Sequence, residues 1–327
     1  MTLARWIGRT VLALVMLGVG LWGAMALWFQ FADTPIAQAV LVGGLLAVTL
    51  ASVVCVPLRR WPVVGVYGVC VLALFGWWAM LTPLNDRVWS ADVARATTGT
   101  IEGDRLTVHN VRNFVWRSDT DFDERWETRT YDLASLTGVD LVMSYWAGES
   151  IAHAIMSFGF ADGQKLAFSI EIRKERTEAY SALAGFFRKY ELSFVAADER
   201  DVIGVRTNVR GEDVRLYRMR LAPEPARALL LTYIAEANDL AATPRFYNSL
   251  TANCTTQIFR MARALDPTLP LDYRLLLAGY VPDYVYDRGG LDTSVPFERL
   301  REQSHIKGRA ESVDPEFSRK IRTVSAP

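Results

Sequence analysis

Three long apolar stretches at the start of the chain constrain its fold more than any other feature. Residues 11–29, 36–56 and 63–81 contain no charged side chain, and each is about 20 residues long, enough for a helix to cross about 30 Å of hydrocarbon. They raise the mean hydropathy of the 327-residue chain to +0.12. We therefore predict a membrane anchor of three transmembrane helices over residues 1–86 and an outer domain over residues 87–327.

The basic residues near these stretches predict the orientation of the anchor. Arg5 and Arg9 precede the first stretch, Arg59 and Arg60 lie between the second and the third, and residues 30–35 contain no Lys or Arg. Lys and Arg are retained on the cytoplasmic side of a membrane. The N-terminus is therefore predicted inside, and the third crossing delivers the outer domain to the periplasm or its equivalent.

The outer domain contains nearly all of the charge, in balanced amounts. Residues 1–86 hold only four of the 36 basic and two of the 36 acidic side chains. No dense basic block remains to neutralise a row of phosphates, so we expect no nucleic-acid partner. One cysteine and three scattered histidines show no metal-ligand spacing, and we expect neither a metal nor another cofactor.

Strand-like and helix-like segments mingle along the outer domain, which indicates the α+β class, with an antiparallel sheet packed on helices. Strands are expected at residues 99–108, 129–133, 151–160, 164–173, 191–196 and 214–221. Helices are expected at residues 181–189, 226–242, 254–265, 271–278 and 296–303. Roughly the last 20 residues are expected to form a polar tail.

The expected strands 151–160 and 164–173 have a parity that predicts their pairing. Their apolar positions, such as Met156 and Phe168, are even-numbered on both strands. Directly opposed residues of a hairpin share a face, so even pairs with even, which requires a loop of odd length. A three-residue loop fits, with Gly163 in the left-handed conformation. This register places His153 opposite Glu171, on the face away from those apolar side chains.

Cys254 is the only cysteine of the outer domain, because Cys55 and Cys70 lie in the second and third apolar stretches. It begins the expected helix 254–265 directly after Asn253, and Asn is a common helix-capping residue. The positive end of a helix favours a thiolate. The free backbone N–H groups of the first turn can receive a developing oxyanion.

These observations predict a catalytic set. Cys254 is the candidate nucleophile, His153 the candidate base, and Glu171 the candidate residue that orients the imidazole. Ser169 faces the same way as Glu171 and is the alternative for the third role. His109 and His305 lie in polar surroundings, where we expect them to be solvated.

Two charged runs, at residues 173–178 and 198–201, are expected to be solvated turns and helix starts. The alternative is that they line the cleft of the candidate site.

Four segments of the outer domain, taken in order, resemble a bacterial family described as the Lnb N-terminal periplasmic domain. They read AHAIMSFGFADGQ, SIEIRKERTEAYSALAGFFRKYEL, ADERDVIGVRTN and NSLTANCTTQIF, and the resemblance covers roughly residues 113–265. The family is a domain of unknown function that is often joined to N-terminal membrane helices. The resemblance implies a multi-pass protein of the bacterial inner membrane with a periplasmic C-terminal domain.

That family is in turn similar to circularly permuted papain-like enzymes of the NlpC and lecithin–retinol acyltransferase type. In those enzymes a His strand comes first, a polar third residue follows on the next strand, and the Cys begins a later helix. His153, Glu171 and Cys254 match this order one by one. The resemblance therefore implies a permuted papain-like (NlpC-like) fold for the outer domain.

Two functions are compatible with these features. The first is a membrane-anchored cysteine hydrolase or acyltransferase, acting through a thioester on an amide or ester of the cell envelope. Its partners would be inner-membrane lipid and an envelope substrate, which is a peptide, a lipoprotein or a lipid. The second is a non-catalytic envelope chaperone or binding protein that uses the same cleft. Only the first function needs a reactive thiol at Cys254.

Overall fold

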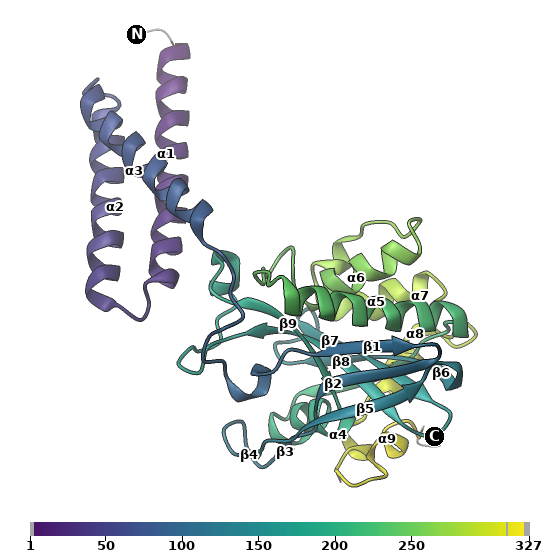
Figure 1. Cartoon of the computed structure of the whole chain (residues 1–327). Helices are drawn as coiled ribbons and strands as arrows, with labels where there is room; N and C mark the ends of the chain where they lie inside the picture. The colour runs from purple at the N-terminus through teal and green to yellow at the C-terminus, as the bar shows by residue number, and fades with distance from the viewer. Residues whose placement is uncertain (1–2, 312, 324–327) are drawn as a thin grey trace. The chain divides into compact units, whose positions relative to one another are not determined.

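A computed structural model describes residues 3–311 and 313–323, and these residues form two compact units (Figure 1). The first unit contains residues 3–83 together with Ser181–Lys189. The second unit contains Leu84–Tyr180 and the described residues from Tyr190 onward. The chain therefore leaves the second unit after Tyr180, contributes Ser181–Lys189 to the first unit, and returns to the second unit at Tyr190.

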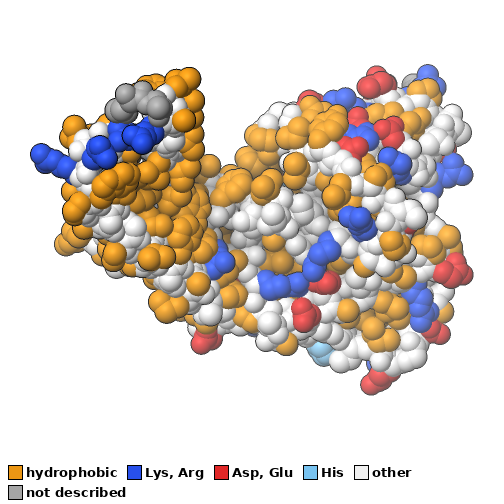
Figure 2. Space-filling view, turned by 90° about the horizontal axis from the view of Figure 1, so that it is seen from above, with side chains coloured by type: hydrophobic (Ala, Val, Ile, Leu, Met, Phe, Trp, Pro, Cys, Tyr) orange, Lys and Arg blue, Asp and Glu red, His pale blue; other side chains and the backbone are white. Residues whose placement is uncertain are grey.

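Three helices form most of the first unit. They are α1 (Leu3–Gln30), α2 (Pro35–Cys55) and α3 (Trp61–Met80). Each is long and apolar enough to cross a membrane, as the sequence predicts. Figure 2 shows hydrophobic side chains over most of the visible surface of these helices, a surface that suits lipid and not water. The chain is therefore a membrane protein.

Close contacts hold the three helices together. Gly20 of α1 leaves room for the side chain of Thr49 in α2, and Gly23 leaves room for Leu74 in α3, since a Cβ at either glycine would clash with that neighbour. The Tyr67 hydroxyl donates a hydrogen bond to the carbonyl oxygen of Met16, at 2.8 Å. Small residues and satisfied polar groups are the usual means by which helices associate in lipid.

The second unit is built on one eight-stranded sheet. The strand order is β1-β2-β9-β8-β7-β6-β10, and β5 pairs with β2. The strands are β1 (Thr98–Glu102), β2 (Arg105–Arg112), β5 (Trp126–Asp132), β6 (Leu136–Tyr145), β7 (Ala152–Phe160), β8 (Lys165–Arg173), β9 (Glu191–Ala197) and β10 (Asp213–Arg218). Strands β3 (Val115–Trp116) and β4 (Phe122–Asp123) form a separate hairpin.

The α+β class is as predicted, but the sheet is mixed and not purely antiparallel. Strands β2 and β9 pair in parallel through Arg112 and Ala197, whereas the other neighbouring strands pair antiparallel. The local hairpins in the sequence predict only antiparallel neighbours. The parallel pair joins strands that lie far apart in the chain, so short-range patterns contain no information about it.

Helices cover both faces of the sheet (Figure 1). One face packs against α5 (Pro223–Ala242), α6 (Cys254–Leu265) and α7 (Val281–Asp287). The other packs against α4 (Glu199–Val202) and α9 (Phe317–Lys320); α8 (Phe297–Ser304) lies against β10. The even-numbered side chains of the β7–β8 hairpin belong to the first core, where Tyr233 of α5 packs against the rings of Phe158 and Phe168.

Three parts of this fold differ from the expectation. Strand β6 lies in the interior of the sheet with both faces covered, so it lacks the alternation by which strands are recognised and was not predicted. The expected helices 181–189 and 271–278 are only short 3-10 turns at Ala184–Phe187 and Tyr273–Leu275. The part of the expected polar tail that the structure describes is packed, because Phe317 and Ile321 are fully buried in the second core, while residues 312 and 324–327 lie outside the described residues.

Candidate active site

The β7–β8 hairpin has the predicted register. Met156 pairs with Phe168 and Ile155 pairs with Ser169, across a loop in which Gly163 has a φ of +89°. The ladder between these strands ends at the Ile155–Ser169 pair. Beyond it, β7 continues alongside β6 only and β8 alongside β9 only. The predicted ladder pair of His153 with Glu171 is therefore absent from the described register, and the two strands diverge there.

The His153 and Glu171 side chains nevertheless meet. His153 Nε2 lies 3.4 Å from Glu171 Oε1. The Ser169 hydroxyl lies between them, 2.7 Å from His153 Nε2 and 2.5 Å from Glu171 Oε1. Both candidates for the third role are thus in place, with Ser169 in direct contact with the ring and Glu171 holding Ser169.

This chain of contacts determines which imidazole nitrogen is free to accept a proton. An ionised carboxylate only accepts hydrogen bonds, so the Ser169 hydroxyl donates its proton to Glu171. The Ser169 oxygen then accepts from His153 Nε2–H. In the neutral ring this leaves Nδ1 unprotonated, as the nitrogen able to receive the thiol proton.

Arg206 completes the chain and was not among the predicted residues. It lies on a π-helical turn, Val205–Val209, and its Nη2 donates to Glu171 Oε1 at 2.7 Å. Its side chain is only 7% exposed. A signal was present in the sequence, since Arg206 is the only charged residue between Ile203 and Val209 and follows the apolar Val205, which favours a buried, paired charge.

Glu171 is held in its ionised form. Burial alone would raise its pKa, but the positive charges of His153 and Arg206 and the hydrogen bond from Ser169 lower the pKa well below its usual range. Glu171 therefore remains a carboxylate throughout the neutral range.

Cys254 lies at the start of α6, as predicted, and Asn253 is its cap. The Asn253 Oδ1 accepts from the Thr256 N–H, and the Asn253 N–H donates to Thr256 Oγ1, both at 2.9 Å. These reciprocal bonds form a capping box, which fixes the first turn of the helix. Because the backbone N–H groups of Cys254 and Thr255 belong to that turn, they have no acceptor within the helix and can bind an oxyanion.

The surroundings of the thiol favour its ionisation. Burial raises the pKa of Cys254, but the charge and hydrogen bond of His153, together with hydrogen bonds from the Ala154 N–H and the Thr255 hydroxyl, lower it to about 7. The side chain is 8% exposed. The structure thus brings together the three predicted residues, and it gives the thiol substantial thiolate character near neutral pH.

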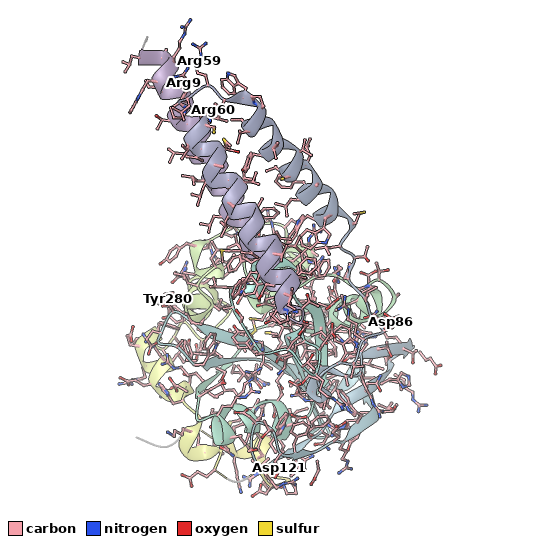
Figure 3. All side chains as sticks on the ribbon, turned by 90° about the vertical axis from the view of Figure 1, so that its left-hand side faces the viewer. Arg9, Arg59, Arg60, Asp86, Asp121 and Tyr280 are labelled. Carbon is pink, nitrogen blue, oxygen red and sulfur yellow. The ribbon has the colours of Figure 1, made fainter. Side chains whose placement is uncertain are left out.

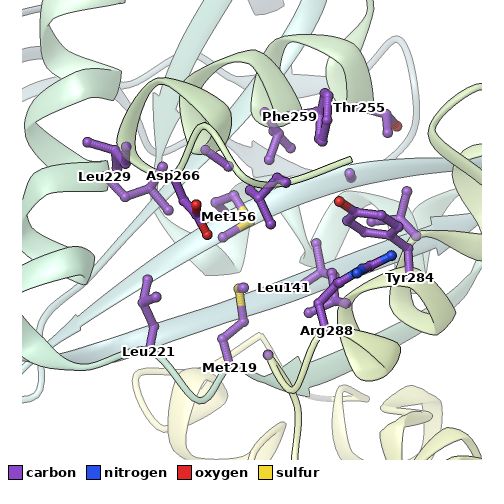
Figure 4. Close-up of a pocket in the computed structure, with 18 of the residues that line it drawn as sticks. Leu141, Met156, Met219, Leu221, Leu229, Thr255, Phe259, Asp266, Tyr284 and Arg288 are labelled. Atoms are coloured by element: carbon purple, nitrogen blue, oxygen red, sulfur yellow. The ribbon is translucent and has the colours of Figure 1, made fainter. Parts of the chain in front are cut away.

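A cavity of about 400 Å³ reaches the first turn of α6, where Thr255 lines it (Figure 4). Its lining includes Ala154 and Thr255, two of the residues that hydrogen-bond Cys254. Leu141, Met156 and Ile258 continue the wall, which is predominantly apolar and lies between β6, β7 and helices α5, α6 and α7. Sequence analysis did not predict this cavity, because its wall comes from segments that are distant along the chain.

The expectation that the charged runs are solvated is wrong for three of their residues. Arg173, Glu199 and Asp201 are buried. Asp201 accepts two hydrogen bonds from Arg112, and Glu199 is paired with Arg322. Buried charges need such partners, and these partners come from β2 and from the C-terminal segment, outside the runs themselves.

Comparison with known proteins identifies one family. Residues 122–279 match the family model described as the Lnb N-terminal periplasmic domain. The resemblance found in the sequence is thus confirmed, and the matched region contains His153, Ser169, Glu171, Arg206 and Cys254. No curated protein and no solved structure matches the chain. The similarity to papain-like enzymes stays a prediction.

Proposed function

We propose that this chain, which carries a match to the Lnb N-terminal periplasmic domain on a membrane anchor, is a cysteine-dependent acyltransferase or hydrolase of the bacterial envelope. The observation that supports this most is the line of contacts from Arg206 through Glu171 and Ser169 to His153, which ends at a thiol of lowered pKa. A binding cleft does not require an activated thiol. The outer domain, residues 87–327, is proposed to have the permuted papain-like fold.

The proposed reaction proceeds through a thioester. His153 Nδ1 takes the Cys254 proton, and the thiolate attacks the carbonyl carbon of an ester or amide. The N–H groups at the start of α6 stabilise the oxyanion. As the intermediate collapses, the bond to the alcohol or amine breaks, and that group leaves with the proton from His153. Water or an acceptor amine then attacks the thioester, which releases the acyl group and restores the thiol.

The cavity indicates the kind of acyl group. Its wall is built mainly from apolar side chains such as Leu141, Met156 and Ile258, and an apolar wall binds an apolar group. A peptidoglycan peptide is polar and would leave this wall unused. We therefore propose a lipid or lipoprotein as the acyl donor, with the fatty acyl chain in the cavity.

The thioester is the species to detect. The full chain is placed in vesicles that contain phospholipid with radiolabelled acyl chains, at neutral pH. Label should become attached to the protein and be released by neutral hydroxylamine, which cleaves thioesters. Replacing His153 by Ala should slow labelling by about 10²-fold or more, the usual contribution of a positioned base.

Two variants serve as controls. Cys254→Ala should lose the label entirely, whereas Cys55→Ala should keep it, since Cys55 lies in α2 and contributes nothing to the site. Absence of hydroxylamine-sensitive label from the wild-type chain, in vesicles that do bind labelled lipid, would favour the non-catalytic envelope chaperone or binding protein. Equal labelling of Cys254→Ala would reject Cys254 as the nucleophile.

The same proposal includes a topology. Arg9, Arg59 and Arg60 lie at one end of the three-helix unit (Figure 3), and positive charge marks the cytoplasmic side. The chain is then a multi-pass inner-membrane protein with residues 1–86 as anchor. We expect alkaline phosphatase fused at Pro327 to be active and a cytoplasmic reporter fused there to be inactive. The reverse pattern would refute this topology.

A further inference from the structure

One segment of the outer part of the sequence packs on the membrane helices. Ser181–Lys189 belongs to the three-helix unit, although its neighbours in sequence, Tyr180 and Tyr190, belong to the second unit. The segment includes the 3-10 turn Ala184–Phe187. In sequence it lies well after α3, which ends at Met80, and so it is outside the anchor predicted over residues 1–86.

Specific contacts fix this segment to the ends of α1 and α3. The Phe187 ring stacks on Phe29, with 5.4 Å between ring centroids. Gln30 Nε2 donates to the carbonyl oxygens of Phe187 and Arg188, at 2.8 and 2.9 Å. Arg188 Nη1 donates to the carbonyl oxygen of Trp78 at 2.8 Å, and its guanidinium lies 4.8 Å from the centroid of that ring.

These contacts indicate the depth at which the segment lies. Gln30 is the last residue of α1, and Trp78 is in the last turn of α3. These helix ends are opposite the basic end of the bundle (Figure 3), and tryptophans at helix ends prefer the boundary between headgroups and acyl chains. A segment packed on them lies at the same boundary.

The segment also presents apolar side chains outward. Leu183 is 56% exposed and Phe186 is 42% exposed. Ala184, which lies between them in sequence, and Phe187, which follows Phe186, are buried. Single exposed apolar residues are common on water-facing surfaces. Here the two lie on one short turn fixed to helix ends that meet lipid, which favours lipid as their surroundings.

We propose that Ser181–Phe187 is a membrane-insertion loop, with Leu183 and Phe186 embedded in the outer leaflet of the phospholipid bilayer. The partner is the lipid surface, and the binding is interfacial. This proposal does not depend on the reactivity of Cys254.

The test measures depth directly. Cysteines are introduced singly as Leu183→Cys, Phe186→Cys and Val115→Cys in a full chain whose native cysteines are replaced by Ala, and each is labelled with an environment-sensitive fluorophore. The protein is placed in vesicles of phosphatidylethanolamine and phosphatidylglycerol that contain a phospholipid spin-labelled near its headgroup. Val115 is the matched control, since it is 58% exposed and adjoins the exposed charges of Arg117, Asp121 and Asp123.

We expect quenching at positions 183 and 186 to be severalfold stronger than at position 115, with blue-shifted emission. Equal quenching at the three positions, in variants that keep the melting temperature of the parent chain, would overturn the proposal. Because Cys254 is absent from these variants, the result is separate from thioester formation. A loop that fails to insert leaves the proposed acyl transfer to be judged on its own experiment.

Discussion

Alkylation of Cys254 should show a midpoint near pH 7, and His153→Ala should move that midpoint above the value of about 8.5 for a free thiol. The imidazole and its hydrogen bond are the strongest influences that lower the thiol pKa, and burial, which raises it, remains in the variant. At pH 7 the thiolate fraction should fall from about half to a few per cent, which slows alkylation roughly tenfold or more.

The measurement uses the full chain with Cys55 and Cys70 replaced by Ala, so that the alkylation rate reports Cys254 alone. Glu171 does not disturb the titration, because its lowered pKa keeps it ionised across this range. His109→Ala is the matched control, since His109 contacts Thr128 on the β2–β5 ladder and has no part in the site. A midpoint at or above 8.5 in the parent chain, or the same midpoint with and without His153, would contradict the proposed activation.

Asp201→Ala should destabilise the second unit by about 3–5 kcal/mol, the cost of leaving a buried charge without its partner. Asp201 is fully buried and accepts four hydrogen bonds. Two come from Arg112, at 2.9 and 3.0 Å, and the others from the Phe114 N–H and the Trp116 indole, each at 2.8 Å. The substitution leaves four donor N–H groups without this acceptor, two of them on the buried guanidinium of Arg112.

Thermal unfolding of the full chain in detergent, followed by tryptophan fluorescence, measures this effect. A loss of that size should lower the melting temperature by on the order of 10 °C. Asp121→Ala is the matched control, because Asp121 also pairs with an arginine, Arg117, but both side chains are at least half exposed. That change should leave the melting temperature nearly unchanged, because solvent screens an exposed pair. Equal shifts for the two variants would show that burial of the Asp201 pair contributes nothing.

Sequence reasoning succeeded where the structure depends on neighbours along the chain. The parity of Met156 and Phe168 sufficed for the hairpin register, because a short loop leaves few alternatives. Asn253 and the apolar spacing after it sufficed for the start of α6. Together these local features predicted the residues that the structure brings to the thiol.

The features that were missed depend on distant segments. Arg206 reaches Glu171 from a turn 35 residues further along the chain, and the parallel pairing of β2 with β9 joins strands separated by six others. The divergence of β7 and β8 beyond Ile155 was also missed, since parity predicts a register and not where a ladder ends. No short-range pattern contains these contacts.

The packing of Phe317 and Ile321 has a consequence for biosynthesis. These two residues fill the second core, on the sheet face that bears His153 and Glu171, yet they are translated about a hundred residues after the last strand of the sheet, which ends at Arg218. Until those residues are synthesised, that part of the second core is incomplete, and its apolar side chains are exposed to other unfolded chains. The second core is therefore completed only once the chain has been translated through Ile321.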